Sequence, residues 1–382
     1  MRQRLESIFL MKSGINNMFD SKHYIPILKW KRAEQGALKA LEERHKKDIT
    51  PLIQFVMPKN KPQEQLEDVI ARFEEQLPEM PEKLIEVWGR TPIFVGVSLL
   101  FTTPLKAKTF DVILREGHKL GGIFIPVIHL NDDQQVKELV WSLSKETSSG
   151  LCIRLICSDF ADPTNPTELN QEIANLLSSG GLSEKDIDLL LDIKETGDNG
   201  DKYTRYLNFS QNIPNLTKWR TFIFASGSFP EDLSQCELDK DNFIPRIDWK
   251  SWKEQINDKK LQRKPSFADY TIQHPIYKEA SQFFHPTSSI KYTLENEWLI
   301  MKGQRQKFDN YLANAALLVK NKKYYYGENF SDGDKYIAEK AKHFETYIKK
   351  PSVKGTGSTE TWLRAGINHH LVLAAHQVAN LS

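Results

Sequence analysis

The sequence is short of the features that mark extracellular, membrane-spanning or strongly charged proteins. It has 3 cysteines in 382 residues, too few for a disulfide framework, and none has the spacing of a zinc site. Its 52 lysines and arginines nearly balance 50 acidic residues, giving a formal net charge of +2. No apolar run approaches the roughly 20 residues that span a bilayer. We therefore expect a cytoplasmic protein without a membrane segment, in which only a local basic patch could attract nucleic acid.

Short motifs with a known chemistry are also missing. The sequence contains no GxSxG, HExxH, GxGxxG, paired CxxC or kinase signature. It therefore names no cofactor and no metal ligands. The opening segment MRQRLESIFLMKSGINN is interrupted by Lys12, and its apolar part is too short for a signal peptide. We expect residues 1–22 to form an N-terminal tail.

What the sequence does contain is a regular alternation of two patterns. Short runs rich in β-branched and apolar residues alternate with segments whose apolar residues have helical spacing. The runs cover residues 24–30, 49–56, 91–100, 122–130, 150–160, 187–195, 220–228 and 267–274. Such alternation is typical of parallel strands joined by crossover helices. Eight units over about 250 residues predict an α/β protein with a (β/α)₈, TIM-barrel-like domain, here within residues 23–320. The alternative is an open, doubly wound sheet.

The pattern changes beyond residue 285. The segment SSIKYTLENEWLIMKG predicts a β-hairpin that turns at Glu295–Asn296. Residues 308–327 predict a helix, which we expect to close the barrel as its eighth. Residues 321–382 then read as a helical C-terminal extension, and we expect it to pack on the barrel.

Two lysines in the first predicted strand indicate where a site lies. Lys29 and Lys31 continue the series of every second residue that begins with Ile25 and Ile27, so all four share one face of the strand. An unpaired ammonium group within the helix layer would cost several kcal/mol. The carboxyl end of the barrel, where the active sites of such barrels lie, avoids this cost through water, a carboxylate or an anionic ligand. We therefore expect both lysines at that end.

Other strands add polar residues at the same end. Asp192 and Lys194 share a face of the sixth strand, and Arg154 lies on the neighbouring fifth strand, where it can pair with Asp192. The candidate site residues are Lys29, Lys31, His129, Arg154, Asp192 and Lys194. Together they predict a mainly cationic site suited to a carboxylate or phosphate.

Each candidate also has a simpler interpretation. Arg154 and Asp192 are equally well explained as a structural ion pair. His129 fits a hydrogen-bonded polar residue, and Lys31 the start of a loop. A more specific chemical hypothesis is that Lys194 forms a Schiff base, with Lys29 or Lys31 as the like-charge neighbour that lowers its pKa.

The quoted stretches also carry a resemblance. HYIPILKWKRAEQGALKAL (residues 23–41), followed by ITPLIQFV, FADYTI, SSIKYT and TWLRAGINHH, resembles the beta protein family of bacterial and phage-associated proteins. The resemblance extends across the chain but transfers no catalytic residues, and Gln54 stands where it implies an acidic residue. Members resemble cargo of mobile elements and defence islands, which implies a role in conflict between phage and host.

Two functions remain open at this point. The first is a hydrolase or lyase that binds a phosphorylated or nucleic-acid ligand at the carboxyl end of the barrel. The second is a non-catalytic sensor or interaction subunit of a defence complex, with protein partners encoded nearby.

Overall fold

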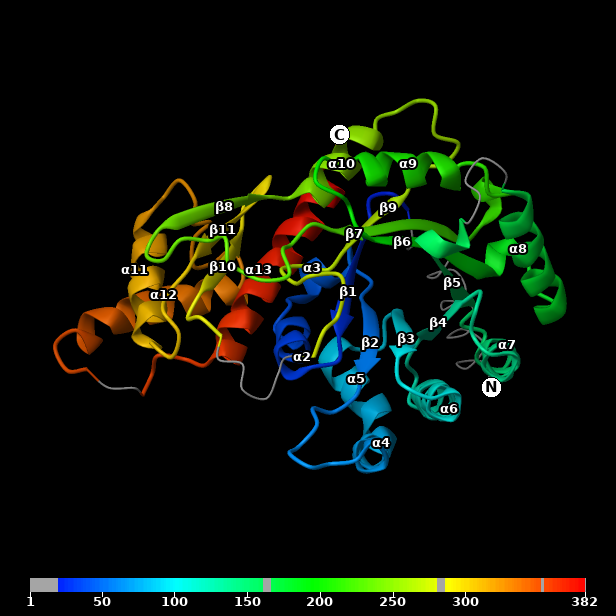
Figure 1. Ribbon diagram of the computed structural model, residues 1–382, viewed down its shortest axis with the longest axis horizontal. Coiled ribbons are helices and arrows are strands. Elements are labelled where there is room, and N and C mark those ends of the chain that lie inside the picture. Colours follow the sequence, from blue (N-terminus) through cyan, green and yellow to red (C-terminus); the bar gives the residue numbers. More distant parts are fainter. Residues whose placement is uncertain (1–19, 161–165, 280–285, 352–353, 382) are drawn as a thin grey trace, which may run out of the picture.

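Eight parallel strands close into a barrel in the computed structural model, which describes residues 20–160, 166–279, 286–351 and 354–381 (Figure 1). In barrel order they are β1 (Tyr24–Lys29), β2 (Leu52–Val56), β3 (Ile93–Leu99), β4 (Phe124–His129), β5 (Leu151–Ile156), β6 (Ile187–Glu195), β7 (Thr221–Gly227) and β9 (Ser266–Asp269). β9 pairs with both β7 and β1, which closes the sheet. The predicted (β/α)₈-like fold is confirmed, and the open sheet is excluded. Most of the predicted tail, residues 1–19, lies outside the described residues.

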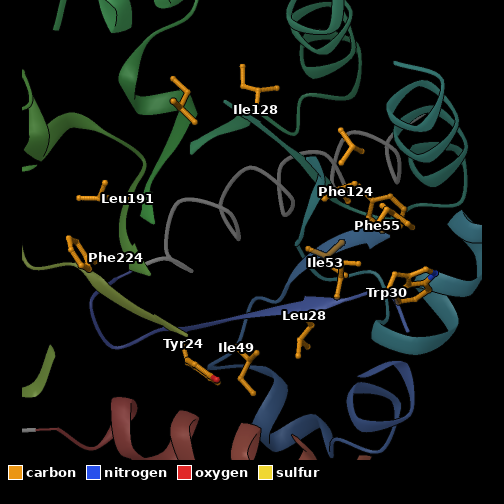
Figure 2. Close-up of a cluster of buried hydrophobic side chains, with 14 of the residues drawn as sticks. Tyr24, Leu28, Trp30, Ile49, Ile53, Phe55, Phe124, Ile128, Leu191 and Phe224 are labelled. Carbon is orange, nitrogen blue, oxygen red and sulfur yellow. The ribbon is translucent and has the colours of Figure 1, made fainter. Parts of the chain in front are cut away.

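The strands are almost continuously apolar because both of their faces are buried. One set of side chains fills the barrel interior: Ile25, Ile27, Leu52, Phe94, Ile125, Val127, Cys152, Leu190, Ile223, Ala225, Ala268 and Tyr270. The alternate set points outward to the helices. Figure 2 shows part of this outer layer, including Tyr24, Leu28, Ile53, Leu191 and Phe224. Ile25 and Ile27 therefore point inward, as predicted, and Lys29 continues on their face.

Helices follow the barrel strands and cover their outer faces (Figure 1). They are α2 (Arg32–Lys39), α3 (Glu43–Lys46), α4 (Leu66–Gln76), α5 (Met80–Trp88), α6 (Thr103–Lys119), α7 (Gln134–Thr147), α8 (Thr167–Gly180), α9 (Asp201–Ser210) and α10 (Ile247–Gln255). Capping side chains fix where some helices begin. For example, α6 begins after Thr102, whose hydroxyl accepts a hydrogen bond from the Leu105 N–H at 3.3 Å. No described helix combines the length and apolar character needed to cross a bilayer.

A second, smaller sheet stands beside the barrel. The predicted hairpin is present as β10 (Ile290–Thr293) and β11 (Glu297–Met301). Its turn at Glu295–Asn296 is closed by a 2.8 Å hydrogen bond from the Leu294 N–H to the Glu297 carbonyl. The segment between β7 and β9 contributes a third antiparallel strand, β8 (Asp241–Pro245). With α11 (Asp309–Lys320) and α12 (Asp332–Tyr347), this sheet forms a separate apolar core.

The helix that takes the eighth position differs from the prediction. α11 packs on the small sheet rather than on the barrel. Its place beside β1 and α2 is taken by α13 (Thr359–Ala379), the red helix between the two sheets in Figure 1. Asn368 of α13 donates a 3.0 Å hydrogen bond to the Ala37 carbonyl of α2. The reason is that α13 is apolar enough to be buried on all sides around Ile367–Ala375, whereas α11 packs with one face and leaves Leu317 60% exposed.

Candidate functional site

The buried carboxylate of Asp192, near the carboxyl end of β6, is the common partner of several polar side chains of the site. The Oδ2 atom of Asp192 accepts hydrogen bonds from Arg154 Nε (3.0 Å) and Nη2 (2.5 Å), Tyr270 OH (2.7 Å) and Lys194 Nζ (3.0 Å). Its Oδ1 atom accepts from the Lys194 N–H at 2.9 Å. The predicted Arg154–Asp192 ion pair is therefore present, and it joins β5, β6 and the end of β9 inside the barrel.

The cluster keeps an excess of positive charge. Burial raises the pKa of Asp192, but the neighbouring charges of Lys194 and Arg154 more than offset burial and hold that pKa well below its usual range. Burial and Arg154 lower the pKa of Lys194, although Asp192 opposes them. Burial, reinforced by the charge of Asp192, raises the pKa of Tyr270 well above its ordinary value. One carboxylate thus faces two cations and a neutral phenol.

An unusual backbone conformation orients the Lys194 side chain toward this cluster. β6 is irregular between Asp192 and Glu195, and Lys194 has a φ of 60°, in the left-handed region that non-glycine residues rarely adopt. This bulge turns the Lys194 ammonium back to Tyr270 OH, at 2.9 Å. Thr271, directly after Tyr270, has a φ of 59°, which is more unusual for a β-branched residue. These two strained residues lie at the ends of β6 and β9, the strands on either side of β7, and such strain is typical of functional sites.

Lys29 ends β1 at the same end and is only 4% exposed. Its Nζ atom donates to Gln273 Oε1 at 3.2 Å. The amide of Gln273 is oriented by Glu34, whose Oε1 atom accepts its N–H at 2.8 Å. Burial lowers the pKa of Lys29 to about 8; Glu34 opposes this shift, and the positive charges of Lys194, Lys31 and Lys291 add to it. These three ammonium groups therefore act on Lys29 from different elements.

Lys31 and Lys291 complete the group of ammonium side chains. Lys31 lies beyond the end of β1, where it donates to Tyr277 OH at 2.8 Å and lies 4.7 Å from the centre of that ring. Lys291 comes from β10 of the small sheet and donates to the Ile272 carbonyl at 3.4 Å. Burial lowers the pKa of Lys291 to about 8. The small sheet thus contributes a cation to the end of the barrel.

His129 and Arg154 keep buried polar atoms free for a further partner. Within the described part of the chain, His129 Nε2 and Arg154 Nη1 are buried without a hydrogen bond. The two residues are paired in register between β4 and β5. Burial lowers the pKa of His129 to about 3, and the charges of Arg154 and Lys194 add to this effect. The imidazole is therefore neutral at pH 7 and can donate or accept a hydrogen bond.

Five residues of the site were not predicted from the sequence: Glu34, Tyr270, Gln273, Tyr277 and Lys291. Tyr270 had a usable signal, because it follows the inward-facing Ala268 at the strand period of two. Gln273 lies in the turn after β9 and Glu34 on α2, and no local pattern connects them to Lys29. Gln54, where the family resemblance implied an acid, is buried and donates to Ser98 Oγ at 3.3 Å.

A cavity of about 900 Å³ opens beside these residues. Lys29, Lys31, Glu34, Gln273 and Tyr277 line part of it. Arg154, Asp192 and Lys194 are not among its lining residues, whereas Lys29 lines it and is also affected by the charge of Lys194. Across the described ranges, no group of three His, Cys, Asp or Glu side chains is arranged to hold a metal ion.

The sequence profile of one protein family, described as Beta protein, matches residues 24–376 of the chain. No curated protein and no solved structure gave a significant match. The matched range includes the whole barrel, the small sheet and most of α13. The chain therefore belongs to the Beta protein family.

Proposed function

We propose that the protein binds an oxyanionic ligand, specifically one with a phosphoryl group, at the carboxyl end of its barrel. The observation that carries this proposal is the charge around Lys29. Among the described residues, its ammonium group is hydrogen-bonded to an amide oxygen rather than to a carboxylate, while Lys31, Lys194 and Lys291 face it. A buried cation of this kind costs free energy unless an anion offsets it.

The surrounding groups fit the needs of a phosphoryl ligand. Ammonium groups bind phosphate oxygens as point charges, and a guanidinium N–H donates to them directionally. Arg154 supplies such an N–H through its unpaired Nη1, and neutral His129 supplies a buried ring nitrogen beside it that can form a hydrogen bond to the ligand. These roles suit a hydrolase or lyase acting on a nucleotide, a sugar phosphate or a nucleic-acid end. The family resemblance adds the setting, a role in conflict between phage and host, and the low cysteine content favours the cytoplasm.

Binding of simple phosphates tests the proposal. Inorganic phosphate, pyrophosphate and a nucleoside triphosphate are titrated by calorimetry against the wild type, Lys29→Met and Lys194→Met. Loss of a charge-assisted hydrogen bond should weaken binding about 10- to 100-fold in each variant. Lys185→Met, at the exposed amino end of the barrel, is the matched control and should bind like the wild type. Equal affinity in all four proteins would contradict the proposal.

A cellular assay tests the setting separately. The protein is expressed with its genomic neighbours, and phage protection is compared between the wild type and the folded Lys29→Met/Lys194→Met double variant. Protection should be lost in the double variant. If protection persists, the carboxyl end of the barrel is not the functional site, and a non-catalytic interaction subunit explains the phenotype better.

A further inference from the structure

The two lysines at the centre of the site have different surroundings. The Lys194 ammonium is held by Asp192 Oδ2 at 3.0 Å and by Tyr270 OH at 2.9 Å. Lys29 has no carboxylate within hydrogen-bond distance in the described ranges, and its amide contact of 3.2 Å is long. Asp192 therefore stabilises the charged form of Lys194, whereas Lys29 has no such partner and lines the cavity, so Lys29 is the lysine best placed to lose its proton and react.

We infer that the Lys29 amine bonds covalently to a phosphorylated ligand, forming an imine with an aldehyde or ketone carbonyl of that ligand. The inference rests on the proposed function, because the ammonium groups around Lys29 hold the phosphoryl group. It also narrows that function: the ligand carries a carbonyl and an anionic group, as in a sugar phosphate or a keto acid phosphate. The 900 Å³ cavity that Lys29 lines gives such a ligand access to the amine.

The protonation of Lys29 supports this chemistry. A free lysine with an ordinary pKa is almost entirely an ammonium ion at pH 7 and cannot attack a carbonyl. Burial and the charges of its lysine neighbours lower the pKa of Lys29 to about 8. At that value roughly one molecule in ten carries the free amine at pH 7.

The step balances with the groups present. The Nζ lone pair attacks the carbonyl carbon; the nitrogen then loses one proton and the former carbonyl oxygen takes up one, which gives a neutral carbinolamine. That oxygen, protonated again, leaves as water, and a protonated imine remains between Nζ and the carbon. Glu34, whose charge acts on Lys29, is 2% exposed and has a buried Oε2 atom without a partner among the described residues. It is the carboxylate placed to carry protons to and from the reacting oxygen.

Reductive trapping tests the inference on the full-length protein. Pyridoxal 5′-phosphate combines an aldehyde with a phosphate, and sodium cyanoborohydride converts its imine to a stable amine. Peptide mass spectrometry should locate the label on Lys29 at substoichiometric reagent, and labelling should quicken as the pH rises through about 8. Lys29→Met should lose the label, Lys194→Met should retain it with weaker binding of the reagent, and Glu34→Gln should be labelled more slowly. Pyridoxine 5′-phosphate, which lacks the aldehyde, should protect Lys29.

The outcomes separate this inference from the proposed function. If pyridoxine 5′-phosphate binds but the label spreads over surface lysines and spares Lys29, the imine inference is wrong and the anion site stands. If Lys29 is labelled equally well by pyridoxal without its phosphate, and phosphate gives no protection, the lysine is reactive but the anion site fails. If neither phosphate compound binds and Lys29 is not labelled, both are wrong.

Discussion

Lys29 shows most directly how a residue's surroundings link stability to function in this protein. Its pKa falls from 10.5 to about 8 on folding. A difference of about 2.5 units corresponds to roughly 3 kcal/mol that the charged form costs the folded state. The charged form of Arg154 is stabilised instead, because its Nη2 atom lies 2.5 Å from Asp192 Oδ2. A cation that destabilises the empty protein is expected where a ligand supplies the missing negative charge.

Replacing Lys29 with methionine should therefore stabilise the protein. Methionine keeps the unbranched shape without the charge, and we expect the free energy of unfolding at pH 7 to rise by up to about 3 kcal/mol. Because the folded-state pKa lies below the unfolded-state value, the unfolded chain binds more protons between pH 8 and 10.5. The wild type should thus gain stability across that window, and its difference from the variant should shrink.

Urea unfolding at several pH values measures this difference. Lys194→Met is the contrasting variant, since it breaks the 3.0 Å ion pair with Asp192 and should lower stability. A Lys29→Met protein that is less stable than the wild type at pH 7 would show that Lys29 has a structural role instead.

The elements of the barrel were predictable to a large extent, and the reason is physical. Seven of the eight barrel strands fall within their predicted runs, and β9 begins one residue before its run. Strands buried on both faces leave a continuous apolar signal, which explains this agreement. The inward direction of Lys29 followed from simple alternation. The Lys29–Gln273–Glu34 chain did not, because Gln273 and Glu34 are 239 positions apart and meet only once the barrel closes.

The position of α13 between the barrel and the small sheet was not predicted either, although two adjacent histidines in its sequence are related to that position. His369 and His370 are adjacent and completely buried. His369 bonds to Asp334 of α12 at 2.7 Å, whereas His370 bonds to Asp269 of β9 at 2.9 Å. Neighbouring helix residues point in different directions, so one helix contacts the small sheet's helices and the barrel together. Helical spacing predicted both helices but could not show which of them occupies the eighth position of the barrel.

Two glycines test how closely α13 packs. A Cβ atom at Gly366 would lie 2.7 Å from the Lys291 carbonyl oxygen, which is backbone and cannot move aside. At Gly36 a Cβ would meet only the flexible side chain of Arg364, also at 2.7 Å. Alanine is favoured over glycine by about 1 kcal/mol within a helix. Gly36→Ala should therefore be nearly neutral, while Gly366→Ala should destabilise by about 1–3 kcal/mol through overpacking.

Thermal unfolding of the two glycine variants gives the comparison directly. Equal melting temperatures would mean that α13 can shift away from β10 at no cost. The Lys291 ammonium would then not be held rigidly at the site.

At the scale of the whole molecule, α13 and β11 join the small sheet to the barrel, and Trp298 and Ile300 of β11 belong to the barrel core. α13 shares the barrel core through Ile367, Leu371 and Val378, while Trp362 belongs to the core of the small sheet. Lys291 reaches the end of the barrel from β10. The site at that end therefore depends on contacts between the barrel and the small sheet, as well as on the barrel strands.

Removal of residues 355–382 should consequently unfold the barrel. Without α13, the apolar surfaces of β1 and α2 that it covers would face water, and His370 could no longer pair with the buried Asp269. We expect an aggregated protein or one that binds an apolar dye strongly and has lost cooperative thermal unfolding. The matched control, deletion of Ser382 alone, keeps α13 (Thr359–Ala379), its C-cap Asn380 and the core-packed Leu381, and should unfold like the full chain. Circular dichroism melting and gel filtration distinguish these cases. If the shorter protein instead melts cooperatively as a monomer, α13 is a separable docking element, and a loss of phage protection on its removal would point to a partner rather than to a collapsed barrel.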